Sequence, residues 1–245
     1  MLRRVFKMNK ERLDKFISNQ LNISRSVVKV ALRRGQATVN GETIKNPSIS
    51  IDIDKDKVCF EGREIEYKKF VYILMNKPKG ILSASNDKNR KTVVDLVPDN
   101  LKRAGLFPVG RLDKDTTGFL IITDNGEYAH NCISPKKDIP KRYIVTLDGR
   151  VTDDMVPLFE SGIVLADGYE CKPARLEIIE ENKARITITE GKNHQIKRMF
   201  GVVGLGVNEL HRESMGGMNL PVDLEAGKCI EITEKEAFSV LLKIC

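Results

Sequence analysis

The chain has 245 residues, of which 41% are hydrophobic and 31% charged, a balance that allows a folded core and argues against a disordered chain. No apolar run reaches the roughly 18 residues that a membrane-spanning helix requires, and the charged first segment, MLRRVFKMNKERLDKF, excludes a secretory signal peptide. Five Cys without a CxxC pair and three scattered His argue against a disulfide framework or a zinc site. We expect a reduced, soluble, cytoplasmic protein.

The net charge of +7 is concentrated at the N-terminal end of the chain. Residues 1–70 hold 16 Lys and Arg against 9 Asp and Glu, whereas residues 71–245 hold 25 of each. A basic segment beside a neutral body indicates an element that docks on a polyanion. The alternative interpretation is a solvated basic surface without a partner.

In chain order, the first predicted elements are two helices and a hairpin. Residues 11–19 predict a short helix, and NISRSVVKVALRRG predicts a second one, with Ser24 as its N-cap and Gly35 at its end. QATVNGETI predicts two strands joined by a turn at Asn40 and Gly41. Together they make one compact unit, whose boundary we place near residue 68.

The second helix has a basic face opposite its apolar one. Arg25, Lys29 and Arg33 recur at steps of four residues, so they fall together on the helix surface. This spacing is typical of a surface that contacts phosphate groups.

The remaining residues, 69–245, mix strands and helices without a regular βαβ rhythm. KFVYILMNKPKG, KRYIVTLDG, CIEIT and the two halves of 174–190 predict strands. GEYAHNCIS, NHQIKRMFGVVG and residues 234–243 predict helices, and TDDMVPLFESG predicts one capped by Thr152. The fold class is therefore α+β, with a mainly antiparallel mixed sheet and flanking helices.

The most distinctive segment is the loop GRLDKDTTG between two apolar strands. It presents the carboxylates of Asp113 and Asp115 beside the cations of Arg111 and Lys114. Loops held by strands often carry reactive groups. Alternatively, these Asp and Thr side chains only satisfy the hydrogen bonds of a hairpin turn.

Two resemblances favour the first interpretation. RLDKFI, SRS, RRG and TVNG, over residues 9–68, resemble the S4 RNA-binding domain. GRLDKDTTGFLIITDNG closely resembles the catalytic motif of pseudouridine synthases, and MNKPKG, KRY and EGKNHQIKRMF fit the same family over nearly the whole chain. HQIKRMFGVVG and LHRESMGG are most similar to its RsuA-like branch, which modifies 16S ribosomal RNA.

The resemblance implies that Asp113 is the catalytic residue, Tyr143 the aromatic side chain that stacks on the target base, and Lys197 the cation beside Asp113. Arg111 and Arg198 would contact phosphate, and His194 is more simply a polar residue at a helix start. Isomerising uridine requires no redox change, so no cofactor or metal is expected. Asp113 could attack C1′ or abstract a sugar proton, and the sequence does not choose between the two routes.

The N-terminal unit would hold structured RNA, with no membrane or obligate protein partner, in a protein that we expect to be a monomer. Asp14 copies part of the catalytic motif in RLDKF but lies in a basic segment, so we expect an ordinary surface residue there. The predicted phosphate contacts are Arg12, Lys15, Arg25, Lys29 and Arg33.

Three alternatives stay open at this point. The target could lie in 23S ribosomal RNA, or the chain could be a noncatalytic RNA-binding or ribosome-assembly factor. A third class, glycoside cleavage, would use Asp113 and Asp115 as an acid and base pair. Release of free uracil would distinguish it from an isomerase.

Overall fold

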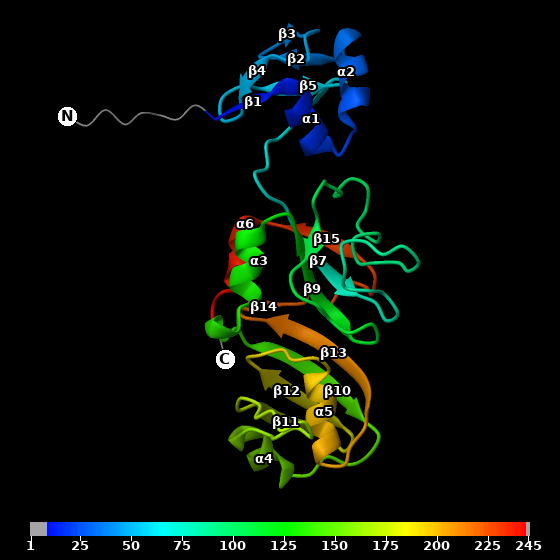
Figure 1. The fold of residues 1–245 in the computed structure, drawn as a ribbon, viewed down its shortest axis with the longest axis vertical. Helices are drawn as coiled ribbons and strands as arrows, with labels where there is room; N and C mark the ends of the chain where they lie inside the picture. Colours follow the sequence, from blue (N-terminus) through cyan, green and yellow to red (C-terminus); the bar gives the residue numbers. More distant parts are fainter. Residues whose placement is uncertain (1–8, 244–245) are drawn as a thin grey trace, which may run out of the picture. The chain divides into compact units, whose positions relative to one another are not determined.

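The computed structural model describes residues 9–243 and forms two compact units. The first comprises residues 9–70 together with the segment Asp99–Gly105, and the second comprises Val71–Pro98 and residues 106–243. Figure 1 traces the elements in chain order. No helix in the described part of the chain is long and apolar enough to span a membrane.

The first unit packs two helices against a small antiparallel sheet (Figure 1). The helices are α1 (Leu13–Leu21) and α2 (Arg25–Arg33). The four-stranded sheet has the order β3 (Glu42–Thr43), β2 (Ala37–Val39), β5 (Val58–Phe60) and β6 (Arg63–Glu64). A separate antiparallel pair joins β1 (Lys10–Arg12) to β4 (Ser50–Asp52).

The local signals for these elements are confirmed. Ser24 caps α2 by accepting a hydrogen bond from the backbone N–H of Val27 at 3.4 Å. Asn40 and Gly41 both have positive φ, 52° and 87°, as a two-residue hairpin turn requires. Helix α1 begins two residues later than predicted, because residues 11 and 12 pair with β4.

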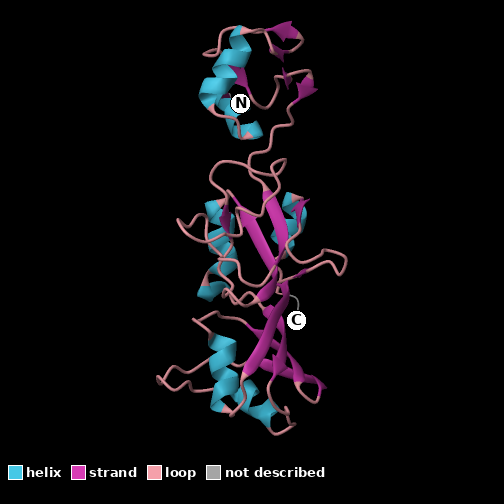
Figure 2. Cartoon of the chain, turned by 90° about the vertical axis from the view of Figure 1, so that its right-hand side faces the viewer, coloured by secondary structure: helices cyan, strands magenta, loops and turns pink. Residues whose placement is uncertain are grey.

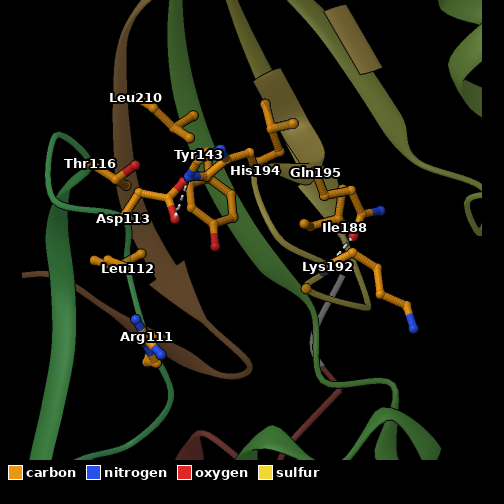
Figure 3. Close-up of a pocket in the computed structure, with 12 residues that line it drawn as sticks. Arg111, Leu112, Asp113, Thr116, Tyr143, Ile188, Lys192, His194, Gln195 and Leu210 are labelled. Carbon is orange, nitrogen blue, oxygen red and sulfur yellow. Dashed lines mark hydrogen bonds and ion pairs between the residues drawn. The ribbon is translucent and has the colours of Figure 1, made fainter. Parts of the chain in front are cut away.

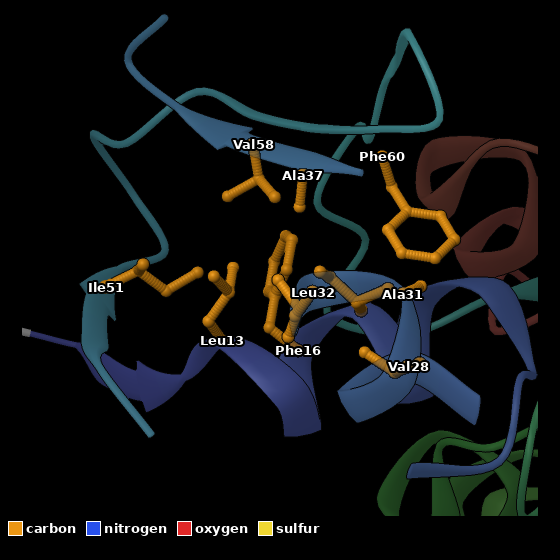
Figure 4. Close-up of a cluster of buried hydrophobic side chains, with 10 residues drawn as sticks. Leu13, Phe16, Val28, Ala31, Leu32, Ala37, Ile51, Val58 and Phe60 are labelled. Carbon is orange, nitrogen blue, oxygen red and sulfur yellow. The ribbon is translucent and has the colours of Figure 1, made fainter. Parts of the chain in front are cut away.

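The core of this unit lies between the helices and the strands, where Leu13, Phe16 and Leu32 are buried (Figure 4). Asp14 is a correction to the sequence prediction, because its side chain is completely buried and does not lie on the surface. Its charge is tolerated there because Arg12 and Arg25 donate hydrogen bonds to both carboxylate oxygens.

The second unit is built on a mixed sheet in which all strand pairs but one are antiparallel among the described residues, so the predicted α+β class is confirmed. Its main strands, in spatial order, are β11 (Arg175–Glu180), β12 (Lys183–Ile188), β10 (Lys141–Leu147), β13 (Val207–Met215), β9 (Thr117–Thr123), β7 (Tyr72–Lys77) and β15 (Cys229–Ile232). Short strands β8 (Phe107–Pro108) and β14 (Met218–Asn219) pair with β9 and β13. The strands twist strongly along the sheet (Figure 2).

Helices cover the two halves of this sheet. Near β7, α3 (Gly126–Ile133) and α6 (Glu234–Ser239) pack through Tyr72, Tyr128 and Phe238, whose rings lie 5.0–6.2 Å apart. At the other end, α4 (Met155–Ser161) contacts α5 (Gln195–Val202) through Phe159 and Phe200. A short 3-10 turn, η1 (Pro135–Lys137), follows α3.

One prediction in this unit is wrong, and one strand was not predicted. Thr152 does not cap α4 with its side chain; its backbone carbonyl accepts from the N–H of Met155, and Asp154 occupies the cap position. Strand β13 is missing from the predicted elements, although it lies between β10 and β9 and forms the parallel pair with β9.

Candidate active site

The loop between β8 and β9 is shaped by bonds to its backbone. Ser83 fixes Leu112 from both sides, accepting from its N–H at 3.1 Å and donating to its carbonyl at 2.8 Å. The N–H of Thr116 bonds the carbonyl of Asp113 at 3.1 Å. These bonds hold the loop at Asp113 while its side chain stays 29% exposed.

Lys77, the last residue of β7, also holds this loop in place. Its side chain is fully buried, and Nζ donates to the carbonyls of Pro78, Asp113, Lys114 and Thr116 at 2.9–3.3 Å. Burial lowers the pKa of Lys77 to about 8, opposed by the nearby carboxylates of Asp115 and Asp113. The carbonyls of the loop therefore face inward onto the ammonium group.

Asp113 and Tyr143 line one cavity of about 70 Å³, although they are 30 positions apart in the chain. Figure 3 shows the Asp113 carboxylate beside the Tyr143 ring, with Leu210 and Thr116 on the same side. Tyr143 comes from β10 and is 7% exposed, so it forms part of the wall of the cavity. The two residues that the resemblance singled out therefore lie beside the same cavity, and their catalytic roles stay a prediction.

His194 also faces this cavity. It occupies the N-cap position of α5, as predicted, with a φ of 49°, but its side chain does not cap the helix. Its Nε2 lies 3.6 Å from Oδ1 of Asp113 (Figure 3). His194 therefore lines the cavity beside Asp113, whereas the sequence interpretation placed it at the helix start alone.

A buried cation packs against the Tyr143 ring. Arg212, on β13, is 3% exposed, and its guanidinium carbon lies 6.0 Å from the ring centres of both Tyr143 and Phe119. Its Nε donates to the carbonyl of Phe119 at 2.8 Å. Gly118 allows the backbones of β9 and β13 to lie close together here, since a Cβ at this position would clash with the backbone oxygen and nitrogen of Arg212.

Lys197 does not pair with Asp113, which corrects the sequence prediction. Its Nζ instead bonds a carboxylate oxygen of Asp115, two residues further along the loop. The hydrogen bond from Lys197 holds the pKa of Asp115 below its usual value, although partial burial opposes this. Asp115 is therefore held in its ionised form, which does not suit the acid that a glycosidase would need.

A larger cleft of about 1020 Å³ adjoins the cavity. Asp113, Asp115, Lys197 and Arg111 all line it, and Arg111 is exposed. Arg198, the other predicted phosphate contact of this unit, forms an ion pair with Asp167 at 2.6 Å. Arg111 therefore lies where a bound strand could reach it, whereas Arg198 already has an acidic partner.

Four of the five predicted phosphate contacts of the first unit have an acidic partner. Arg12, Arg25 and Lys29 surround Asp14, and Lys15 pairs with Glu11 at 2.8 Å. Arg33 lies exposed in the last turn of α2. All five side chains belong to one unit, separate from the cavity residues.

Sequence reasoning missed several side chains that shape the site, above all Lys77, Leu210 and the buried network under α5. In that network, Gln195 donates to Glu190 at 2.7 Å and accepts from the N–H of Lys192 at 2.9 Å. A charged residue closing the apolar run YILMNK was the available signal for Lys77. No pattern in the sequence indicated the hydrogen bonds of Gln195 with Glu190 and Lys192.

Comparison with known proteins identifies the family to which the chain belongs. A family model described as RNA pseudouridylate synthase matches residues 71–201, and the S4 domain model matches residues 11–56. The chain is 38% identical to ribosomal small subunit pseudouridine synthase A of Escherichia coli, over 94% of this chain and 100% of that protein. It is 41% identical to an uncharacterised RNA pseudouridine synthase of Bacillus subtilis, over 92% and 96%.

A solved structure supports the same assignment. A crystal structure of a pseudouridylate synthase superposes with a TM-score of 0.66 at 34% identity, covering 94% of this chain and 99% of that one. The chain therefore belongs to the RNA pseudouridylate synthase family and is an RNA pseudouridine isomerase with an S4 domain.

Proposed function

We propose that this enzyme converts one specific uridine of 16S ribosomal RNA to pseudouridine in the cytoplasm, using Asp113 and no cofactor. The observation that carries the proposal is the full-length similarity to the Escherichia coli small-subunit enzyme, in a chain where Asp113 and Tyr143 share a cavity. The noncatalytic alternative does not fit this family membership.

The chemistry requires little beyond an ionised carboxylate. The N1–C1′ bond of the uridine breaks and a C5–C1′ bond forms, while the proton on C5 is transferred to N1, so atoms and electrons balance within the nucleotide. Asp113 acts either as a nucleophile at C1′ or as the base that removes a sugar proton. Lys77 and Ser83 support both routes, because they fix the loop backbone that carries the carboxylate.

Tyr143 supplies the surface on which the target base rests. A uridine in folded RNA must leave its stack to reach a carboxylate, and an aromatic ring recovers about 1–3 kcal/mol of stacking. The base would enter the small cavity, and the flanking strand would follow the larger cleft past Arg111 and Lys197. The two units then have separate roles: the first holds the RNA, and the second modifies one nucleotide.

Asp113→Asn tests the chemistry. We expect pseudouridine formation on 16S transcripts to fall by at least about 1000-fold, because the amide neither attacks nor accepts a proton, while RNA affinity stays within about twofold. Pseudouridine is measured by base-specific chemical modification and primer extension. Normal turnover by this variant would contradict the role of Asp113.

Mapping the pseudouridines of ribosomal RNA tests which RNA is the substrate. Ribosomal RNA from cells with and without the gene should differ at one 16S position. A missing pseudouridine in 23S RNA, with 16S unchanged, would show that the target lies in the large subunit.

A further inference from the structure

Asp14 forms the centre of a basic cluster in the first unit. Arg12 donates to it through Nε and Nη2 at 3.1 Å, and Arg25 donates through Nη2 to both carboxylate oxygens at 3.1 and 2.9 Å. Lys29 lies 4.0 Å away. The three cations come from β1 and two successive turns of α2, so the carboxylate ties the strand to the helix.

The anion of this cluster is buried, whereas its three cations are partly exposed. The Asp14 side chain has no exposed surface, whereas those of Arg12, Arg25 and Lys29 are 46%, 46% and 41% exposed. Burial raises the pKa of Asp14, but hydrogen bonds from Arg25 and Arg12 more than offset it, so the pKa lies below its ordinary value. An incoming phosphate meets the cations and not the anion behind them.

The cluster keeps donors available for a ligand. A guanidinium has five N–H groups. Within the described residues, the bonds that Arg25 makes to Asp14 use Nη2 alone, which leaves Nε and Nη1 on a half-exposed side chain. Ser48 fixes Arg12 further, accepting from Nη2 at 3.0 Å. The guanidinium groups are thus oriented before any RNA binds.

We propose that Asp14 is a positioning residue, which holds Arg12, Arg25 and Lys29 as one preformed phosphate-binding surface for structured RNA. The inference rests on the proposed docking role of the first unit. It predicts an effect opposite in sign to simple electrostatics, because removing an acidic side chain from a basic surface should otherwise strengthen RNA binding.

Asp14→Asn in the full-length chain tests the sign. We expect affinity for a 16S transcript to fall about fivefold, and the slope of log K against log salt concentration to become shallower by about 1. Glu11→Gln is the matched control, since it removes a carboxylate that pairs with Lys15 in the same unit, and binding should be unchanged or tighter. Equal or tighter binding by a folded Asp14→Asn would overturn the proposal.

Arg25→Lys gives a second measurement at a half-exposed position, and circular dichroism checks that the variant folds. Lysine keeps the charge but loses the forked geometry, so we expect about fivefold weaker binding. Arg34→Lys is its control and should bind like wild type, because Arg34 is exposed at the C-cap of the same helix, is not among the predicted phosphate contacts and has no ion pair to Asp14 among the described residues. Arg25→Lys binding like wild type would contradict preorganisation.

A double-mutant cycle isolates the coupling. If Asp14 acts by positioning Arg25, Arg25→Lys should change affinity by less than about twofold in the Asp14→Asn background. Fully additive effects would overturn the proposal. Failure of the proposed function looks different, because wild-type enzyme would then form no pseudouridine in 16S RNA, whatever these binding measurements show.

Discussion

At the scale of single residues, Lys77 shows how one buried side chain shapes the site. Its ammonium group donates hydrogen bonds to four carbonyls, and three of these carbonyls belong to the loop that carries Asp113. A buried ammonium with its donors satisfied is tolerated, whereas the same carbonyls without it would be left unpaired. Lys77 therefore holds the loop without contacting the substrate.

Lys77→Met is expected to lower the free energy of unfolding of the second unit by about 2–4 kcal/mol, because buried carbonyls lose their donor. It should lower kcat more than it changes KM, since the loop no longer fixes Asp113. Chemical denaturation and steady-state kinetics measure the two effects. Lys79→Met is the control at an exposed neighbour and should leave both unchanged. A stable, fully active Lys77→Met enzyme would show that the loop needs no anchor.

Lys197 forms an ion pair with Asp115 in this structure, and the effect of removing this pair can be predicted. Lys197→Met leaves the charge of Asp115 unpaired in the cleft that Asp113 also lines. Because the unpaired Asp115 carboxylate would repel the carboxylate of Asp113 and the phosphates of the RNA, we expect kcat to fall about 10-fold or more. Adding Asp115→Asn should restore part of that loss. No recovery in the double variant would indicate that Lys197 pairs with Asp113 once RNA is bound.

The resemblance to pseudouridine synthases singled out Asp113 and Tyr143, whereas their residue types alone did not distinguish them from turn and core residues. The structure places both side chains beside one cavity. The burial of Asp14 and Lys77 could not be predicted, because each is a charged residue whose hydrogen-bond partners are set by the tertiary structure. Lys197 was placed near the right loop but on the wrong carboxylate, a difference of two residues.

At the scale of elements, β13 explains the largest omission in the predicted fold. Leu210, Arg212 and Ser214 alternate as buried residues along VNELHRESM. Two of these three are polar, so the strand lacks the apolar alternation that identifies a half-buried strand. Arg212 belongs there because Tyr143 and Phe119 pack against it, a reason that only the tertiary structure provides.

The same strand predicts a pH dependence of stability. Burial lowers the pKa of His211, opposed by Glu213, and Nδ1 lies 2.8 Å from Thr117 Oγ1. The unfolded chain therefore binds a proton more readily, so stability should fall as the pH drops below about 6.5. His211→Gln should flatten this decline in thermal melts between about pH 7 and 5. His130→Gln, on the exposed side of α3, should not.

At the scale of the whole molecule, the pattern of the sequence was enough for the fold class and the S4 resemblance, but not for how the first unit is completed. The segment Asp99–Gly105 groups with it although it lies far beyond residue 68. Arg103 donates to the carbonyls of Lys68 and Lys69 at 2.6 and 3.3 Å, a contact between distant positions that no local signal indicates.

Removing residues 1–67 tests the division of labour and keeps both carbonyls that Arg103 contacts. The shortened chain lacks the segment that carries +5 of the net charge of +7, from 14 Lys and Arg against 9 Asp and Glu, so we expect weaker binding to a 16S transcript. Each phosphate group that the protein no longer neutralises should lower the slope of log K against log salt by about 1. Full-length Asp113→Asn should keep the wild-type slope, and circular dichroism checks that the shortened chain folds. An unchanged affinity and slope would place RNA docking in the second unit, along the cleft beside Arg111.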